Sequence, residues 1–258
     1  MCTLALYFRV FDNYPLLLAA NRDEHFDRPS APPGLICDQP KIIAGKDLRV
    51  GGTWLGVNEH GLIVGILNRR VNLIGGEPLA PSVARSRGLL CLDLLKLESA
   101  KAGWELIIAD TSLYNPFTVI FADKDQAFVA YNNDEPKIIA KRLGPGLHVF
   151  SSAAELDLSS AKADHARERF ALLKNKPLGN VSQPSAWLPE LKDVLADHTL
   201  RDGSNDPGDA ICVHRESSGT VSSSVIVYEQ ARSRFETFFC SGPPCQNQFG
   251  EPLTLDVR

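Results

Sequence analysis

The chain begins with Met1-Cys2, and Cys2 is its first residue with a side chain that could act as a nucleophile. Removal of Met1 would leave the thiol of Cys2 beside the chain's own α-amino group, which is the arrangement of an N-terminal nucleophile. An α-amine has an unperturbed pKa of about 7.7–8.0, so near neutral pH it can take the thiol proton without a histidine. Cys2 is therefore the candidate nucleophile. The alternative is that Cys2 is a small buried hydrophobe, which is common for cysteine.

Two charged residues are expected to lie beside this thiol. The apolar runs 2–10 and 15–20 flank Phe-Asp-Asn-Tyr at 11–14, and Asp and Asn at such a break favour a β-hairpin. A hairpin returns residues 21–23 to the start of the first strand. There Arg22 could hold a thiolate or a substrate carboxylate, and Asp23 could orient the amine or the arginine. A plain ion pair after a strand is the alternative.

The run Ala-Asn-Arg-Asp-Glu at 20–24, followed by Arg28-Pro29, resembles the signature of the NRDE family, also called the transport and Golgi organisation family. That family is similar to the N-terminal nucleophile hydrolases. The resemblance implies an α+β fold, a four-layer α-β-β-α sandwich with two mainly antiparallel sheets, formed by a single domain over residues 1–258. Agreement with the family continues at Ala-Gly-Lys-Asp 44–47, Gly-Gly-Thr-Trp-Leu-Gly 51–56, Leu-Asn-Arg-Arg 67–70, Ser-Arg-Gly 86–88 and Pro-Gly-Leu 145–147.

The segment 56–62, ahead of Leu67-Asn68, resembles the bile-salt hydrolase and penicillin V acylase branch, in which the later asparagine helps to form the oxyanion hole. The resemblance implies this role for Asn68, whereas a strand cap or turn is the alternative. Four further residues are candidates for substrate binding: Asn21, Glu24, Trp54 and Arg70. Family members tend to have Ser-Asn after the Pro-Gly-Leu strand, and this chain has Ser151-Ser152. We therefore expect one polar group of the site to differ.

Composition limits the classes of function. Among 258 residues, 44% are hydrophobic and 22% are charged, which is ordinary for a globular protein. The net charge of −4 does not favour binding to nucleic acid or to an anionic membrane surface. We find neither an apolar stretch of about 18 residues nor a secretion signal. The expected compartment is the cytoplasm, and the expected partner is a small molecule.

Cysteines and histidines give no metal signature in the sequence. The six cysteines show no repeated framework and are expected to be reduced thiols. Cys240 and Cys245 lack the two-residue spacing of common zinc sites, although a redox pair or metal clip there is an alternative. The six histidines show no paired spacing either. We predict no metal site, and the chemistry of Cys2 requires no cofactor.

Hydrophobic periodicity predicts the elements that must position these residues. Segments 28–40 and the tail after residue 240 are rich in proline and are expected to be irregular. Glycines 51, 52 and 56 suit a close approach of backbones. Helices are predicted over 82–97, 101–106, 160–175 and 185–198, and strands over 41–44, 53–57, 62–67, 117–122, 128–131, 137–140, 147–151, 210–214, 220–229 and 234–240.

Two functions follow from these features. The first is an amidohydrolase that cleaves a non-peptide C–N bond through Cys2. The second, which the family resemblance implies, is a haem or lipid-like ligand trafficking protein on the same scaffold. A haem carrier would need an axial Cys, His, Met or Tyr, and with a single methionine in the chain Cys2 or a histidine would have to serve.

Overall fold

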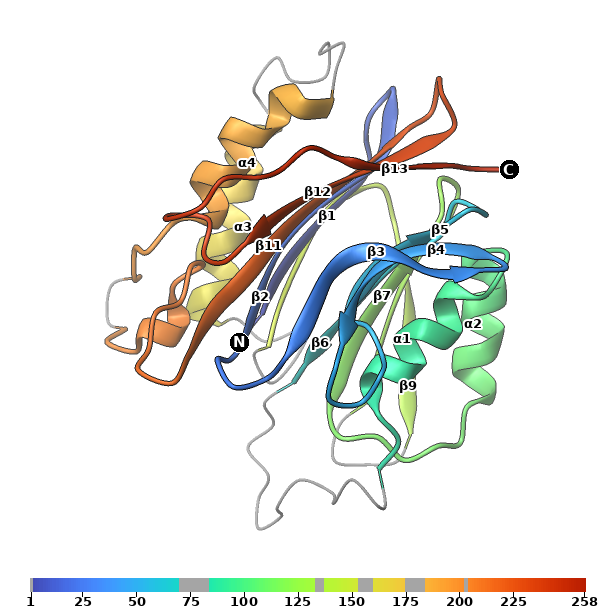
Figure 1. Ribbon diagram of the computed structural model, residues 1–258, viewed down its shortest axis with the longest axis horizontal. Coiled ribbons are helices and arrows are strands. Elements are labelled where there is room, and N and C mark those ends of the chain that lie inside the picture. The colour runs from blue at the N-terminus through green and yellow to red at the C-terminus, as the bar shows by residue number, and fades with distance from the viewer. Residues whose placement is uncertain (1, 70–83, 133–136, 153–159, 175–183, 202–203) are drawn as a thin grey trace. The chain divides into compact units, whose positions relative to one another are not determined.

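A computed structural model of the chain describes residues 2–69, 84–132, 137–152, 160–174, 184–201 and 204–258. By their internal contacts these residues form two compact units (Figure 1). The first unit contains the N-terminal residues up to Arg28 together with Pro145–Thr254. The second contains Pro29–Gly144 and Leu255–Arg258. Each unit is built on one sheet, and two α-helices pack on that sheet.

A six-stranded sheet has the order β10-β1-β2-β11-β12-β13, and its first five strands belong to the first unit. The predicted N-terminal hairpin is confirmed, because β1 pairs antiparallel with β2 from Thr3 opposite Asn21 onward. The long strand β2 then pairs antiparallel with β11 along its other edge. The strands are β1 (Thr3–Phe11), β2 (Tyr14–His25), β10 (Gly146–Ser151), β11 (Ser218–Glu229), β12 (Arg234–Ser241) and β13 (Leu253–Asp256).

The sheet of the second unit has seven strands in chain order, each antiparallel to the next. Its helices are α1 (Arg87–Leu95), which begins later than predicted, and α2 (Ala100–Ala109), as predicted. Buried leucines of α1 pack with the apolar side chains of β6 and β7. The strands are β3 (Ser30–Asp38), β4 (Lys41–Asp47), β5 (Leu55–Asn58), β6 (Ile63–Asn68), β7 (Phe117–Ala122), β8 (Ala127–Asn132) and β9 (Ile138–Leu143).

Three sequence-based expectations were wrong. The proline-rich segment 28–40 contains a strand, β3, which lies at the edge of its sheet and shifts register twice against β4. An edge strand with bulges tolerates proline, because the missing N–H need not join a ladder. The predicted strand 210–214 reduces to a single bridge between His214 and Gly219. The tail, expected to be irregular, contains β13.

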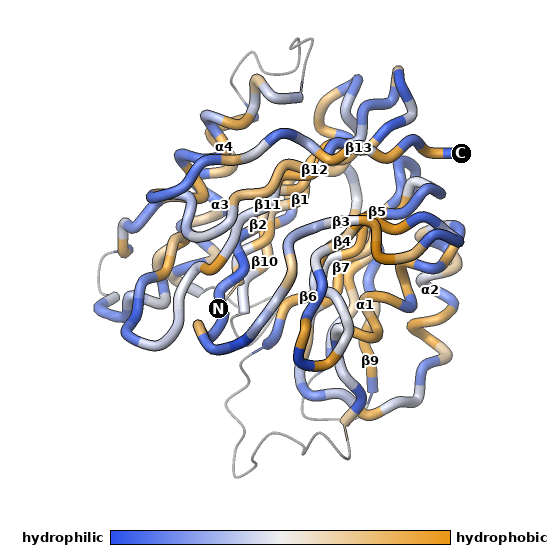
Figure 2. The backbone as a smooth tube through the Cα atoms, viewed as in Figure 1, coloured by the Kyte–Doolittle hydropathy of each residue, from blue (hydrophilic) through white to orange (hydrophobic). Residues whose placement is uncertain are grey.

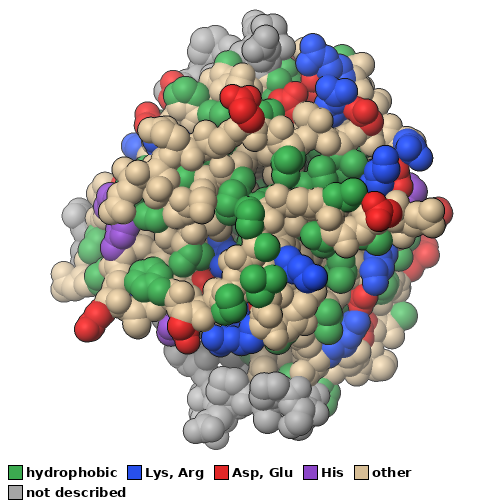
Figure 3. Space-filling view, viewed as in Figure 1, with side chains coloured by type: hydrophobic (Ala, Val, Ile, Leu, Met, Phe, Trp, Pro, Cys, Tyr) green, Lys and Arg blue, Asp and Glu red, His purple; other side chains and the backbone are tan. Residues whose placement is uncertain are grey.

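Hydrophobic residues are concentrated along the strands and recur along the helices, whereas many of the connecting turns are hydrophilic (Figure 2). The face in view in Figure 3 carries acidic and basic side chains interspersed with one another. Within the described part of the chain, no helix combines the length and apolar character needed to cross a membrane.

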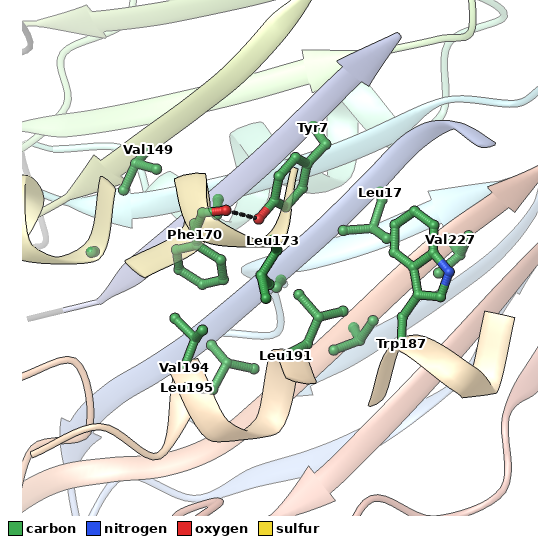
Figure 4. Close-up of a cluster of buried hydrophobic side chains, with 14 of the residues drawn as sticks. Tyr7, Leu17, Val149, Phe170, Leu173, Trp187, Leu191, Val194, Leu195 and Val227 are labelled. Atoms are coloured by element: carbon green, nitrogen blue, oxygen red, sulfur yellow. Dashed lines mark hydrogen bonds between the residues drawn. The ribbon is translucent and has the colours of Figure 1, made fainter. Parts of the chain in front are cut away.

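The core of the first unit lies between its sheet and the helices α3 (Ala161–Leu173) and α4 (Leu188–Leu195), as Figure 4 shows. Side chains at alternating strand positions face the helices, as the pleat requires. Tyr7 in this core donates a hydrogen bond of 2.6 Å to the Phe170 carbonyl, so its buried hydroxyl is satisfied. Trp187 packs edge-on against Phe11 with ring centroids 4.4 Å apart. The amphipathic helices predicted near 160–175 and 185–198 are thus confirmed.

The backbone at Gly52 packs closely against that of Gly88, so a side chain at position 52 should destabilise the second unit. A Cβ atom on Gly52 would lie 2.4 Å from the carbonyl carbon of Gly88, so Gly52→Ala must push the start of α1 away. We expect a loss of about 1–3 kcal/mol in the free energy of unfolding, measured by urea denaturation. The control is Gly34→Ala, where a Cβ meets nothing within 4 Å. Equal stabilities of the two variants would contradict this packing.

Candidate functional site

Cys2 directly precedes β1 and lies next to residues 21–23, as the predicted hairpin requires. The register that pairs Thr3 with Asn21 puts Cys2 level with Arg22. The Cys2 thiol lies 3.7 Å from the carbonyl oxygen of Asp23. The backbone nitrogen of Cys2 donates a 2.9 Å hydrogen bond to Ser152 Oγ, and Ser152 N donates to the Cys2 carbonyl at 3.2 Å. Ser152, the residue that departs from the family pattern, therefore holds the nitrogen of Cys2 directly.

The environment of the thiol keeps it protonated. Burial raises the pKa of Cys2 above its ordinary value, and the nearby Asp23 carboxylate raises it further. The positive charge of the chain's N-terminus, the hydrogen bond to the Asp23 carbonyl and the positive charge of Lys162 lower the pKa without overcoming burial. Near neutral pH the side chain is a thiol, and its reaction as a nucleophile needs a base.

Asp23 is the centre of a buried polar network. Its Oδ2 accepts a hydrogen bond of 2.9 Å from Lys162 Nζ, and its Oδ1 accepts one of 2.7 Å from Thr220 Oγ1. The side chains of Lys162 and Asp23 are only 1% and 2% exposed. The network joins β2 to the first turn of α3 and to β11.

Lys162 was missed at the level of sequence, although a signal was present. Helix α3 begins after Ser160, whose side chain accepts a hydrogen bond from Ala163 N. Lys162 lies on the same buried face as Ala163, Ala166 and Phe170. A lysine on the apolar face of an amphipathic helix requires a buried partner, and the predicted helix 160–175 could have been searched for one.

Arg22 and Glu24 form a second, looser set of charges. Arg22 is largely buried, and its Nη2 lies 3.9 Å from Glu24 Oε2. Arg28 Nε lies 3.7 Å from the same oxygen. Arg22 stands between Asn21 and Asp23 in β2, so its side chain belongs to the opposite face of the strand. The catalytic role of Arg22 and the substrate-binding role of Glu24 stay predictions.

Asn21 uses its amide group to hold neighbouring segments. Its Nδ2 donates to the carbonyls of Leu195 at 2.8 Å and Ile211 at 2.9 Å. Its Oδ1 accepts a hydrogen bond of 2.6 Å from Ser223 Oγ. These bonds fix the end of α4 and the segment before β11 onto β2. The predicted contact of Asn21 with substrate stays a prediction.

Two further predicted residues, Asn68 and Trp54, belong to the second unit. Asn68 ends β6, opposite Phe117, and its side chain is exposed. The ring of Trp54 covers Gly45, where a Cβ atom would lie 2.6 Å from the ring. The oxyanion role of Asn68 and the substrate role of Trp54 stay predictions, and Arg70 lies outside the described residues.

The buried pair of Asp23 and Lys162 predicts a large effect on stability. In Lys162→Met the carboxylate stays buried without its cation, so we expect a loss of about 3–5 kcal/mol in the free energy of unfolding. The matched control is Lys101→Met on an exposed helix face, which should cost less than about 1 kcal/mol. Asp23→Asn in the Lys162→Met background should recover part of the loss. Urea denaturation of the four proteins measures these differences, and similar losses for Lys162→Met and Lys101→Met would refute the pairing.

Solved structures of similar fold cover nearly the whole chain. A penicillin V acylase from Agrobacterium tumefaciens matches with a TM-score of 0.57 and 13% identity, over 93% of this chain and 83% of that one. A mutant of conjugated bile acid hydrolase from Clostridium perfringens matches with a TM-score of 0.59 and 11% identity, over 97% of this chain and 92% of that one. Such low identities show the fold alone. They confirm the predicted class, an α+β fold of the N-terminal nucleophile hydrolase type with two mainly antiparallel sheets.

Sequence relatives confirm the resemblance drawn from the motifs. The chain is 32% identical over 149 residues to the mouse transport and Golgi organization 2 homolog, and 32% identical over 149 residues to the human homolog. Each match covers 54% of this chain and 51% of the relative, so it spans about half of the relatives' length. The family model described as "Transport and Golgi organisation 2" matches residues 1–238. The chain belongs to the Transport and Golgi organisation 2 family.

Proposed function

We propose that this protein is an N-terminal nucleophile amidohydrolase that cleaves a non-peptide C–N bond through Cys2. The observation that carries the proposal is the fixed position of the Cys2 thiol and of the Cys2 nitrogen, a peptide nitrogen in the structure that stands in for the α-amine freed when Met1 is removed. Ser152 Oγ holds the nitrogen of Cys2 at 2.9 Å, while the thiol lies against the Asp23 carbonyl. The fold is shared with an acylase, a bile acid hydrolase and an N-acylethanolamine-hydrolyzing acid amidase, which supports an acyl amide as substrate.

The first half-reaction begins with a proton transfer. While Met1 is attached, burial raises the pKa of the thiol; once Met1 is removed, the free α-amine of Cys2 would take the thiol proton as sulfur attacks the carbonyl carbon. A carbon–sulfur bond forms, and the carbonyl electron pair moves onto oxygen. When the tetrahedral intermediate collapses, the C–N bond breaks, and the leaving nitrogen takes the proton from the α-ammonium group. The products are an amine and a thioester on Cys2.

In the second half-reaction, water replaces the thiol as the nucleophile and the same proton transfers occur. Water gives one proton to the α-amine and attacks the thioester carbon. The carbon–sulfur bond then breaks, the thiolate recovers that proton, and a carboxylic acid is released. Neither half-reaction requires a metal or an organic cofactor.

The neighbouring side chains would position the base and assist the sulfur. One N–H of the amine can donate to Ser152 Oγ, as the Cys2 nitrogen does in the structure, which leaves the nitrogen lone pair for the thiol proton. The Lys162 charge lowers the pKa of the thiol and would stabilise negative charge that develops on sulfur. Asp23 holds Lys162 in place. Lys162 is thus a positioning and electrostatic residue, and Ser152 orients the base.

Haem carriage through Cys2 is the contrasting proposal for this site. An axial thiolate must lose its proton, and burial of Cys2 raises the pKa of the thiol. The raised pKa bears equally on both roles, because a nucleophile and an axial ligand each have to lose this proton. A titration with haem, followed by the Soret band, distinguishes them. A saturable one-to-one complex that is lost in Cys2→Ala would favour the carrier.

Processing and turnover together test the proposal. Intact-mass spectrometry should show that Met1 is removed, and N-acyl amides with fatty, bile or phenoxyacetyl groups supply the substrate panel. We expect Cys2→Ala to lower kcat/KM by about three orders of magnitude or more with little change in melting temperature. Cys37→Ser, which alters a thiol of the second unit, should keep wild-type turnover. Retained Met1, or turnover equal to wild type in Cys2→Ala, would refute the proposed nucleophile.

The pH dependence of turnover identifies the base. The α-amine accepts a proton only when it is neutral, and the thiol stays protonated because its pKa is raised. The rate should therefore rise with pH through the amine pKa, about 7.7–8.0 before any environmental shift. The measurement is kcat/KM across pH 5 to 9 for the most active amide. A rise centred near pH 4–5, the region of an ordinary carboxyl group, would instead indicate a carboxylate base.

A further inference from the structure

The side chains of two histidines and two cysteines lie close together in the first unit. They are not the residues whose hydrogen bonds with Cys2 are described above. His198 follows the end of α4, Cys212 and His214 lie in the segment before β11, and Cys245 lies in the turn after β12. Each can offer one ligand atom, and these four atoms all lie within 4.8 Å of one another. Cys212 is buried, whereas Cys245 is exposed.

The separations among Cys212, His214 and Cys245 fit a tetrahedral metal site, and His198 completes a group whose ligand atoms lie within 4.8 Å of one another. Zinc bonds of about 2.3 Å to sulfur and about 2.0–2.1 Å to nitrogen place two sulfurs about 3.8 Å apart, and sulfur and nitrogen about 3.6 Å apart. The two thiol sulfurs of Cys212 and Cys245 are separated by 3.8 Å. The Nε2 atom of His214 lies 3.8 Å from the Cys212 sulfur and 3.3 Å from the Cys245 sulfur.

Hydrogen bonds around the cluster hold the ligands in place. His198 Nδ1 lies 3.1 Å from the carbonyl oxygen of Cys212. A carbonyl oxygen only accepts, so Nδ1 carries the proton and Nε2 keeps its lone pair, as in metal-binding histidines whose other nitrogen donates to a carbonyl. Cys212 N donates to the Asp197 carbonyl at 2.9 Å. The turn that carries Cys245 is closed by the N–H groups of Gln246 and Asn247, which donate to the Pro243 carbonyl.

We propose that His198, Cys212, His214 and Cys245 bind one Zn²⁺ ion in a tetrahedral site of two sulfurs and two nitrogens. Four protein ligands leave no open position, which is the pattern of a structural rather than a catalytic zinc. The ion would connect the end of α4, the segment before β11 and the turn after β12. None of the four ligands takes part in the proposed amidohydrolase chemistry, and the zinc proposal does not depend on that chemistry.

The sequence predicted no metal site because the ligand spacing is irregular. Only Cys212 and His214 are close in the chain, and an alternating pair in extended backbone can direct two side chains the same way. The other two ligands are supplied by elements that meet only in the folded sheet. A disulfide between Cys212 and Cys245 is the competing use of the same sulfurs, but their separation of 3.8 Å is well beyond the roughly 2.05 Å of an S–S bond.

Metal analysis of the full chain tests the proposal. The protein is stripped with a chelator, titrated with Zn²⁺ and with Co²⁺, and analysed by elemental mass spectrometry and absorbance. We expect one ion per chain, thiolate-to-cobalt charge-transfer absorption, and a higher melting temperature with Zn²⁺. Cys245→Ser and His214→Asn should weaken Zn²⁺ binding by at least about 100-fold, since even the loss of an outer-shell partner costs 10–100-fold. Cys245 is exposed, so its variant is expected to fold.

Two matched controls separate this site from other thiols. Cys37→Ser and Cys2→Ala should bind Zn²⁺ like the wild type, because neither residue belongs to the cluster. Wild-type affinity in both Cys245→Ser and His214→Asn would overturn the proposal. Failure of the wild type to bind either ion would also overturn it, and a Cys212–Cys245 disulfide found in peptide maps after mild oxidation would then identify a redox pair.

Discussion

The carboxylate of Asp23 is buried, and the surrounding structure depends on how its charge is compensated. An isolated buried ion costs several kcal/mol, so this position requires both a cation and hydrogen-bond donors. Lys162 supplies the cation from α3 and Thr220 supplies a hydroxyl from β11. Two segments distant in sequence are thereby fixed to β2, next to the thiol of Cys2. The docking of α3 and β11 onto β2 therefore depends in part on one compensated charge.

The side chains of the motif Asn21-Arg22-Asp23-Glu24 lie on both faces of strand β2. Asn21 and Asp23 are two residues apart, so both side chains are directed toward the helices. Asn21 holds the end of α4 and the Ile211 carbonyl, while Asp23 holds α3. Arg22 belongs to the other face, with Glu24. The motif is therefore structural as well as a candidate for chemistry, since each of the two side chains makes a hydrogen bond that joins a helix to β2.

Sequence alone predicted the elements that rest on local patterns. The N-terminal hairpin was predictable because apolar runs flank Asp12 and Asn13, and it placed Asp23 near Cys2. Strand β3 was not predictable from local patterns, because its prolines are tolerated only at the edge of a sheet. Whether a strand lies at the edge depends on how the whole sheet is assembled. Lys162 and the cluster around Cys212 were missed for a related reason. Their partners lie far along the chain, and no spacing rule connects residues 23 and 162 or 198 and 245.

The two sites of the first unit meet at Thr220. Its Oγ1 donates to Asp23 and accepts a 2.9 Å hydrogen bond from Val213 N. Val213 stands between Cys212 and His214, and Thr220 N donates back to the Val213 carbonyl at 2.8 Å. An ion bound by Cys212 and His214 would fix Val213, which lies between them. Val213 in turn would hold the Thr220 hydroxyl, which donates to Asp23. A structural metal would then act on the proposed chemistry indirectly, because the orientation of Asp23 determines the place of the Lys162 charge.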